Sequence, residues 1–275
     1  MSMTRSAIFN GLDLSSLTGV SITGIDYNDM PARTVAAYPL ARTDGSKQIA
    51  AFFNNRVVQI FGLINDSGGQ GAFEADRATL MQSLVGQDLP LDIIIGSVQQ
   101  RFFATLTSLI FTDATGSANQ NNSDTNAGLG IFTITFQCSS PFGIDPNLQN
   151  GLTTTVISAS PSTQNLATIA GTYKTAPYIS VYITSGTGLG VAANFVQLTN
   201  PVTGKYILIT RAFAVGELLV VDVYNKKVTV NNVAVDFSGN LDLFWDIGAG
   251  GQITYTDNLS ARSIKLTLQY FARYL

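Results

Sequence analysis

The sequence predicts a mainly β protein built from two β-rich halves, and three observations lead to this prediction. Short runs rich in Val, Ile, Thr, Phe and Tyr recur along the chain between polar or glycine-containing breaks, which is typical of strands. A single segment has helical spacing. A Pro-, Ser- and Thr-rich stretch divides the 275 residues, a length that suits two domains of roughly 150 residues each.

The predicted strands cover most of the sequence. The alternating stretches Val228–Val230 and Val233–Val235 flank Asn231-Asn232, which predicts a hairpin because two asparagines suit the positive φ angles of a type I′ turn. The predicted strands are 18–25, 48–53, 56–64, 91–96, 101–111, 129–138, 178–184, 193–199, 205–210, 217–223, 227–230, 233–236, 242–246, 251–256 and 263–271.

The helical segment is 74–85. Acidic residues at its start suit the positive end of a helix, and Gly86 suits its termination. A single helix of this length needs a sheet to cover its apolar face. That face is predicted to carry Phe73, Leu80, Met81 and Leu84.

A long hairpin is predicted where strands 101–111 and 129–138 flank the polar segment 112–128. Loops longer than about 12–15 residues inside compact domains are usually functional or disordered. The residues leave two interpretations open for 112–128, a solvated tip or an arm that reaches another subunit.

The boundary between the halves is expected near 141–165, where Pro141 and Pro146 oppose continuation of the preceding strand. The predicted arrangement is an N-terminal β domain over 1–145, a linker region over 146–165, and a C-terminal β-sandwich over 166–275.

The amino-acid composition indicates what kinds of partner the chain could have. Charged residues make up 12% of the chain, about half of the roughly 25% typical of soluble domains. Because charges are depleted in interface cores, this deficit suggests that much of the surface is buried against other proteins. The net charge of −3 argues against specific nucleic-acid binding. No apolar run is long enough for a membrane span, and Met1–Asn10 lacks a secretory pattern, so cytoplasmic synthesis is expected.

An enzyme is not expected. The sequence contains no histidine, which excludes Ser-His-Asp and Cys-His arrangements and histidine-based zinc sites. The Gly-x-Ser-x-Gly and Ser-x-x-Lys patterns are also absent. Cys138 is the sole cysteine and is predicted to be a small buried apolar residue. No catalytic, cofactor-binding or metal-binding residue is assigned.

Three partial motifs fail on spacing. Gly68–Gly71 lacks the Gly-Lys-Ser/Thr ending of a phosphate loop, and Asp124–Asn126 lacks the glycine and glutamate positions of a calcium loop. On a strand, Asp242 and Asp246 would lie about 13 Å apart, too far for the roughly 5–9.5 Å of a glycosidase pair. Trp245 between them is either a core residue or a sugar-stacking platform.

The order of these elements resembles the distal tail protein family of long-tailed (siphovirus) phages. The resemblance spans nearly the whole chain and rests on order and spacing. Its features are the helix 74–85 followed by Leu91-Asp-Ile-Ile-Ile95, Arg101-Phe-Phe-Ala-Thr-Leu106 entering the long hairpin, the exit Phe136-Gln-Cys-Ser-Ser-Pro-Phe142, the restart Thr175-Ala-Pro-Tyr-Ile-Ser-Val181, Val221-Asp222 before a hairpin, and the terminal strand Ile264–Leu275.

The resemblance implies a structural hub in the virion tail. It implies an N-terminal β-sandwich or barrel-like domain that forms a hexameric ring, and a galectin-like or carbohydrate-module-like C-terminal β-sandwich that projects outward. The ring would join the tail tube to tail-tip, tail-associated or receptor-binding proteins, as in a baseplate hub, and let DNA pass. Segment 112–128 would then reach a neighbouring subunit or ring. A carbohydrate-binding adhesin using Trp245 and a tail-tube subunit remain the alternatives.

Overall fold

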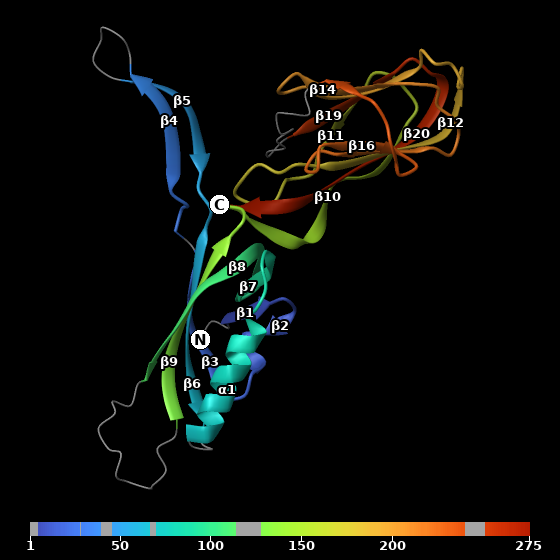
Figure 1. The fold of residues 1–275 in the computed structure, drawn as a ribbon. Coiled ribbons are helices and arrows are strands. Elements are labelled where there is room, and N and C mark those ends of the chain that lie inside the picture. The colour runs from blue at the N-terminus through green and yellow to red at the C-terminus, as the bar shows by residue number, and fades with distance from the viewer. Residues whose placement is uncertain (1–4, 28, 40–45, 67–69, 114–127, 240–250) are drawn as a thin grey trace, which may run out of the picture. The chain divides into compact units, whose positions relative to one another are not determined.

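The computed structural model describes residues 5–27, 29–39, 46–66, 70–113, 128–239 and 251–275. The chain divides into two compact units, shown in Figure 1. Unit 1 comprises Met1–Ile144 with Leu275, and unit 2 comprises Asp145–Tyr274. The predicted fold class is confirmed, because both units are built mainly of antiparallel strands.

Unit 1 is a bent antiparallel sheet with one helix packed against it. Strand β8 pairs with β7 through its first residues and with β9 through its last, with a register shift between Leu106 and Ser108. A shift of this kind bends a strand. The strand order is β2-β1-β7-β8-β9-β6-β3. The elements are β1 (Arg5–Phe9), β2 (Leu12–Asp13), a 3-10 turn (Leu14–Ser16), β3 (Val20–Asp26), β4 (Arg33–Pro39), β5 (Ser46–Phe53), β6 (Val57–Asp66), α1 (Gln70–Ser83), β7 (Leu89–Ile95), β8 (Val98–Asp113) and β9 (Gly128–Cys138).

The helix α1 covers β6 and β9, which supplies the partner that its length requires. Phe73, Leu80 and Leu84 are buried in the unit 1 core as predicted. The prediction for Met81 is wrong. This residue is 49% exposed and does not lie on the buried apolar face of the helix. Met81 follows Leu80 directly, and adjacent helical residues point about 100° apart, so both cannot face the same sheet.

Strands β4 and β5 form a hairpin that we call the arm. They pair with each other from Arg33↔Phe53 to Pro39↔Ser46 and with no other strand in the described part of the chain. The base of the arm is closed by a 2.7 Å hydrogen bond from the Asn54 amide to the Ala32 carbonyl oxygen.

Unit 2 is a β-sandwich, as predicted. One sheet has the order β17-β16-β15-β12-β20-β10 and the other the order β11-β19-β13-β14-β18. Alternate residues of both sheets meet in one core, for example Ile179 and Val181 of β12 with Val196 and Leu198 of β13. The strands are β10 (Gly143–Ile157), β11 (Ser162–Asn165), β12 (Tyr178–Thr187), β13 (Phe195–Asn200), β14 (Lys205–Thr210), β15 (Leu218–Asp222), β16 (Lys227–Val230), β17 (Val233–Ala234), β18 (Ser238–Gly239), β19 (Gln252–Asp257) and β20 (Ser260–Tyr274).

Two sequence predictions of local structure have different outcomes here. Asn231 and Asn232 have φ angles of 47° and 66°, which confirms the predicted hairpin turn between β16 and β17. The segment 146–165, predicted as a linker region, instead contains most of β10 and all of β11. Strand β10 continues past Pro146. Its pairing with β8 involves Ile144, which comes before the proline, and its other partner is β20.

Candidate interaction surfaces

Several residues considered from the sequence lie outside the described residues. They are Asp124, Asn126, Asp242, Trp245 and Asp246, together with Gly68 and most of segment 112–128. Within the described residues, no group of three or more His, Cys, Asp or Glu side chains could hold a metal ion. In the same part of the chain, no helix has the length and apolar character needed to cross a membrane.

Cys138 lies in the core of unit 1 and is 1% exposed, as predicted. Burial raises the pKa of its thiol to about 12, against a smaller opposing influence of Arg56. The thiolate is the reactive form of cysteine, so this thiol is inert near neutral pH.

The arm presents apolar side chains to solvent. Val35 of β4 is 53% exposed and Phe52 of β5 is 62% exposed. An isolated two-stranded hairpin is at best marginally stable in water, and strands with unpaired edges readily pair with another chain. The arm therefore has the features of a segment that another protein covers.

A second candidate surface is the outward face of β6, β9 and β8. Ile131 lies opposite Leu63 of β6 and Thr112 of β8, and Ile110 lies opposite Thr133. Ile110 and Ile131 are 57% and 50% exposed. Between Val57 and Leu63 of β6, Ser108 and Thr112 of β8, and Ile131 and Gln137 of β9, the outward positions include no charged residue. They are Val57, Gln59, Phe61, Leu63, Ser108, Ile110, Thr112, Ile131, Thr133, Thr135 and Gln137.

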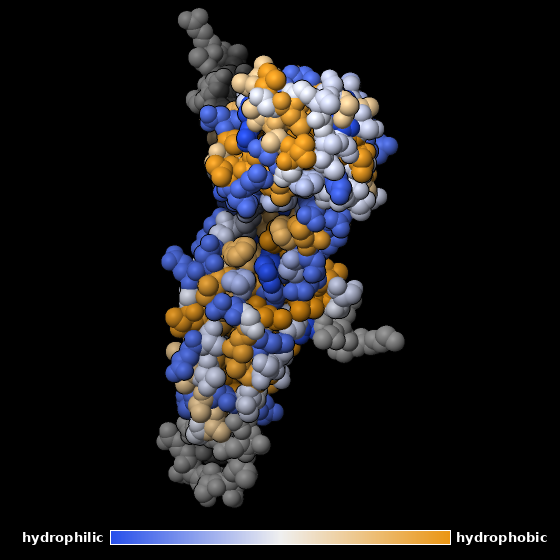
Figure 2. All heavy atoms as spheres, turned by 90° about the vertical axis from the view of Figure 1, so that its right-hand side faces the viewer, coloured by the Kyte–Doolittle hydropathy of each residue, from blue (hydrophilic) through white to orange (hydrophobic). Residues whose placement is uncertain are grey.

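Exposed apolar side chains occur in both units. Figure 2 shows hydrophobic residues interspersed with hydrophilic ones on the visible faces of each unit. Among the large apolar residues described in unit 2, the most exposed are Val202, Val233 and Tyr224, at 74%, 68% and 64%. These side chains stand on turns and short strands, where they add apolar contact area for a partner.

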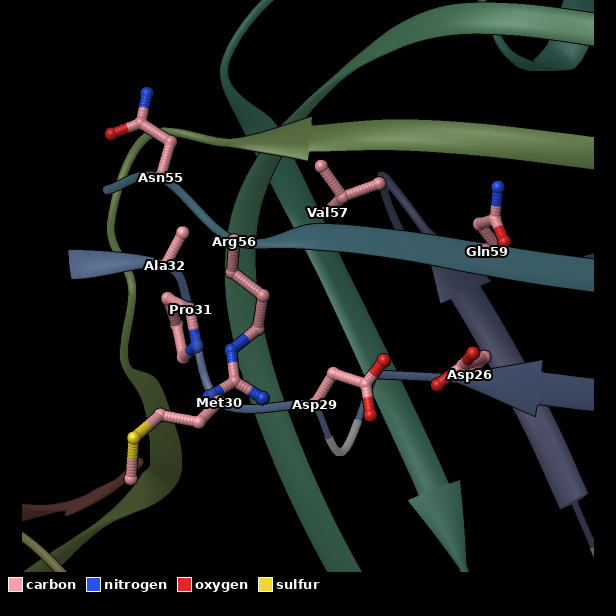
Figure 3. Close-up of a pocket in the computed structure, with 9 residues that line it drawn as sticks. All are labelled: Asp26, Asp29, Met30, Pro31, Ala32, Asn55, Arg56, Val57 and Gln59. Atoms are coloured by element: carbon pink, nitrogen blue, oxygen red, sulfur yellow. The ribbon is translucent and has the colours of Figure 1, made fainter. Parts of the chain in front are cut away.

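A pocket of about 350 Å³ lies beside the base of the arm in unit 1. The segment that leads from β3 to β4 forms one side, and the start of β6 forms the other, as Figure 3 shows. The lining residues are Asp26, Asp29, Met30, Pro31, Ala32, Asn55, Arg56, Val57 and Gln59.

Arg56 is the unusual residue of this pocket, because its side chain is charged yet the residue is 3% exposed. Its guanidinium donates to the carbonyl oxygens of Tyr27 and Pro141 and lies over the ring of Phe102. Burial lowers its pKa, and nearby groups including Asp29 partly oppose this. No carboxylate forms a salt bridge with Arg56 within the described residues.

Unit 2 contains a buried charged network of a different kind. Asp257 accepts a 2.6 Å hydrogen bond from the hydroxyl of Tyr255 and lies 2.6 Å from Nε of Arg262. The Nε–H is not directed along that contact, so this is an ion pair without hydrogen-bond geometry. Every charge here has a partner, which is the arrangement of a structural network rather than of a binding site.

The C-terminal part of the chain is similar in sequence to a domain of phage tail components. Residues 170–274 match the family model of the siphovirus-type tail component, C-terminal domain. The matched segment runs from before β12 to the last residue of β20. A comparison with curated proteins found no match.

A solved structure shares the fold of the whole chain. Dit (gp 19.1) of phage SPP1 aligns with a TM-score of 0.70 and 12% identity, over 99% of this chain and 100% of that one. A chain of the phage P2 baseplate aligns with a TM-score of 0.42 and 10% identity over 98% of both chains. At such identities the likeness shows the fold alone.

Residues 170–274 are thus similar to a siphovirus-type tail component domain. The chain as a whole has the fold of SPP1 Dit. The resemblance to siphovirus distal tail proteins, predicted from the order of strands and helix, is thereby confirmed.

Proposed function

We propose that this protein is a structural hub at the distal end of a phage tail. The observation that carries the proposal is the fold shared with SPP1 Dit from end to end. That protein is described as a paradigm of the hub adsorption apparatus in phages that infect Gram-positive bacteria. The match of residues 170–274 to a tail-component domain supports the same role independently.

The proposed assembly is a ring of six copies that joins the tail tube to tail-tip, tail-associated or receptor-binding proteins. Unit 1 is the proposed ring-forming part, because it carries the arm with its unpaired edges and exposed apolar residues. Unit 2, with its own core, is the proposed attachment site for the outer proteins.

The proposed role includes passage of DNA through the ring. A channel of this kind should not hold phosphates, and phosphates are held mainly by Lys and Arg. Between Val57 and Leu63 of β6, Ser108 and Thr112 of β8, and Ile131 and Gln137 of β9, the outward positions carry no basic residue. Such a face is compatible with the passage of DNA. The role needs no catalytic residues, and we propose a virion protein made in the host cytoplasm.

Removal of the chain tests the proposal. An amber codon in its gene should yield particles or tails without tail-tip proteins, because the hub that attaches them is missing. Mass spectrometry of purified particles measures this, with growth on a suppressor host as the control. Normal complements of tip proteins in the absence of the chain would contradict the proposal.

Segment 112–128 provides a further test of the assembly. We propose that it reaches a neighbouring subunit or ring, so shortening it should weaken rings or block tail assembly. Native mass spectrometry of the variant and of the intact chain counts the copies. Unchanged hexamers together with unchanged tails would remove this part of the proposal.

The second candidate function is a carbohydrate-binding adhesin, and it depends on Trp245. A glycan array with the intact chain and with Trp245→Ala separates the two functions. Glycan binding that disappears in the variant, by a chain that stays monomeric, would favour the adhesin.

A further inference from the structure

The pocket beside the arm, which we call the Arg56 pocket, contains a donor without an acceptor. Arg56 uses Nε and one terminal nitrogen for the carbonyl oxygens of Pro141 and Tyr27. Its other terminal nitrogen, Nη2, is buried and has no hydrogen-bond partner among the described residues. An unsatisfied buried donor is unfavourable, and more so when it is charged, so an acceptor brought to this site gains an unusually favourable contact.

The acceptor has to come through the pocket. Arg56 lines the pocket and its side chain runs from the start of β6 towards segment 29–31, as Figure 3 shows. The volume of about 350 Å³ accommodates one or two amino-acid side chains. The opposite side is apolar at Met30, Pro31 and Ala32.

Two carboxylates decide what kind of ligand suits the pocket. Asp26 and Asp29 line it and form no salt bridge within the described residues. They repel a free phosphate or a nucleic acid. Two carboxylates are also fewer than the three ligating side chains required of a metal-binding group above. Among the described residues, no aromatic side chain lines the pocket to offer a surface on which a sugar could stack. A polypeptide that offers an acceptor oxygen and a basic side chain satisfies both kinds of group.

We infer that the Arg56 pocket receives a segment of a second copy of this chain, which presents a carbonyl or carboxylate oxygen to Arg56 and a Lys or Arg side chain to Asp26 and Asp29. The second copy is favoured because the pocket adjoins the arm. Its residues 29–32 lead into β4 and its residues 55–57 follow β5, so a chain that covers the exposed Val35 and Phe52 of the arm also reaches the pocket. The choice of a second copy rests on the proposed ring.

Cross-linking from the pocket tests this inference directly. The native thiol of Cys138 is buried with its pKa raised to about 12, so Met30→Cys supplies the reactive thiol in the otherwise native chain. Met30 is 64% exposed, which makes the substitution tolerable. A photoactivatable maleimide attached there should join two copies, and mass spectrometry of the joined peptides identifies the partner segment. Val202→Cys, at a position 74% exposed in unit 2, is the matched control.

Charge reversal gives an independent readout. Asp29→Arg should weaken self-association of the full chain at least tenfold in light scattering, whereas Asp236→Arg, an exposed acid of unit 2, should leave it unchanged. The expected result is that copies cross-link from position 30 but not from position 202. The cross-link from position 30 should be lost when Asp29→Arg is added.

Three outcomes would overturn the inference: monomers alone from Met30→Cys, cross-links in particles solely to another protein, or undiminished association of Asp29→Arg. The proposed hub function is decided separately, because the position of the chain on the virion does not depend on which surface joins its copies.

Discussion

The hydroxyl of Tyr255 donates a 2.6 Å hydrogen bond to Asp257, whose other carboxylate oxygen lies 2.6 Å from Arg262. The side chain of Asp257 is completely buried and that of Arg262 is 14% exposed. Burial together with the bonded carboxylate raises the pKa of Tyr255, so the phenol remains a donor at all ordinary pH values. The three side chains thereby tie the end of β19 to the beginning of β20.

Asp257→Asn tests the energetic weight of this network. The variant leaves Arg262 buried without a counter-charge, and removal of one partner from a buried pair costs about 3–5 kcal/mol. Urea denaturation should show that loss in the free energy of unfolding of unit 2. Asp236→Asn, at an exposed site, should change the same quantity by less than about 0.5 kcal/mol. Equal values for the two variants would show that the network is not structural.

Gly130 and Gly71 form a matched pair for unit 1. A Cβ atom on Gly130 would lie 2.7 Å from the ring of Phe73, whereas one on Gly71 would meet nothing within 4 Å. Gly130→Ala should therefore destabilise unit 1 by about 1–3 kcal/mol through overpacking. Gly71→Ala, in the first turn of α1, should stabilise it by up to about 1 kcal/mol because alanine favours the helix. Denaturant unfolding measures both changes in stability. Adding Phe73→Leu to Gly130→Ala should recover part of the lost free energy of unfolding, because the smaller side chain leaves room for the new methyl group.

The raised pKa of the Cys138 thiol leads us to expect that the stability of the fold depends on pH. Burial raises its pKa from 9.0 to about 12, so above pH 9 the unfolded chain loses a proton that the folded chain keeps. The associated stability is fully present below pH 9 and is lost as the pH rises towards 12, at about 1.4 kcal/mol per pH unit. Unfolding free energies from pH 8 to 11 should fall less steeply for Cys138→Ala than for the native chain. Identical slopes would contradict the burial of the thiol.

Some elements were predictable because their signal is local. The helix follows from apolar spacing in α1, and the hairpin of β16 and β17 from Asn231-Asn232, whose positive φ angles need little tertiary support. The strands β6, β8 and β9 follow from long alternating runs.

Other elements have no local signal. Strand β10 has a polar sequence with a proline, and it becomes a strand through pairing with β20, more than 100 residues later in the chain. Tertiary contacts override propensity in such cases. Strands β1, β2, β4, β11 and β18 were also not predicted. The sequence gives no sign that Arg56 is buried. Its burial depends on the carbonyl groups of Tyr27 and Pro141, which come together from distant segments of the chain.

The central claim is that the chain forms the hub at the distal end of a tail, and its position on the virion is the most direct test. Antibody fragments raised against unit 2 can be located on purified particles by electron microscopy, with particles lacking the chain as the control. The account predicts label confined to the tail end farthest from the head. Label along the length of the tube, or at the head, would contradict it.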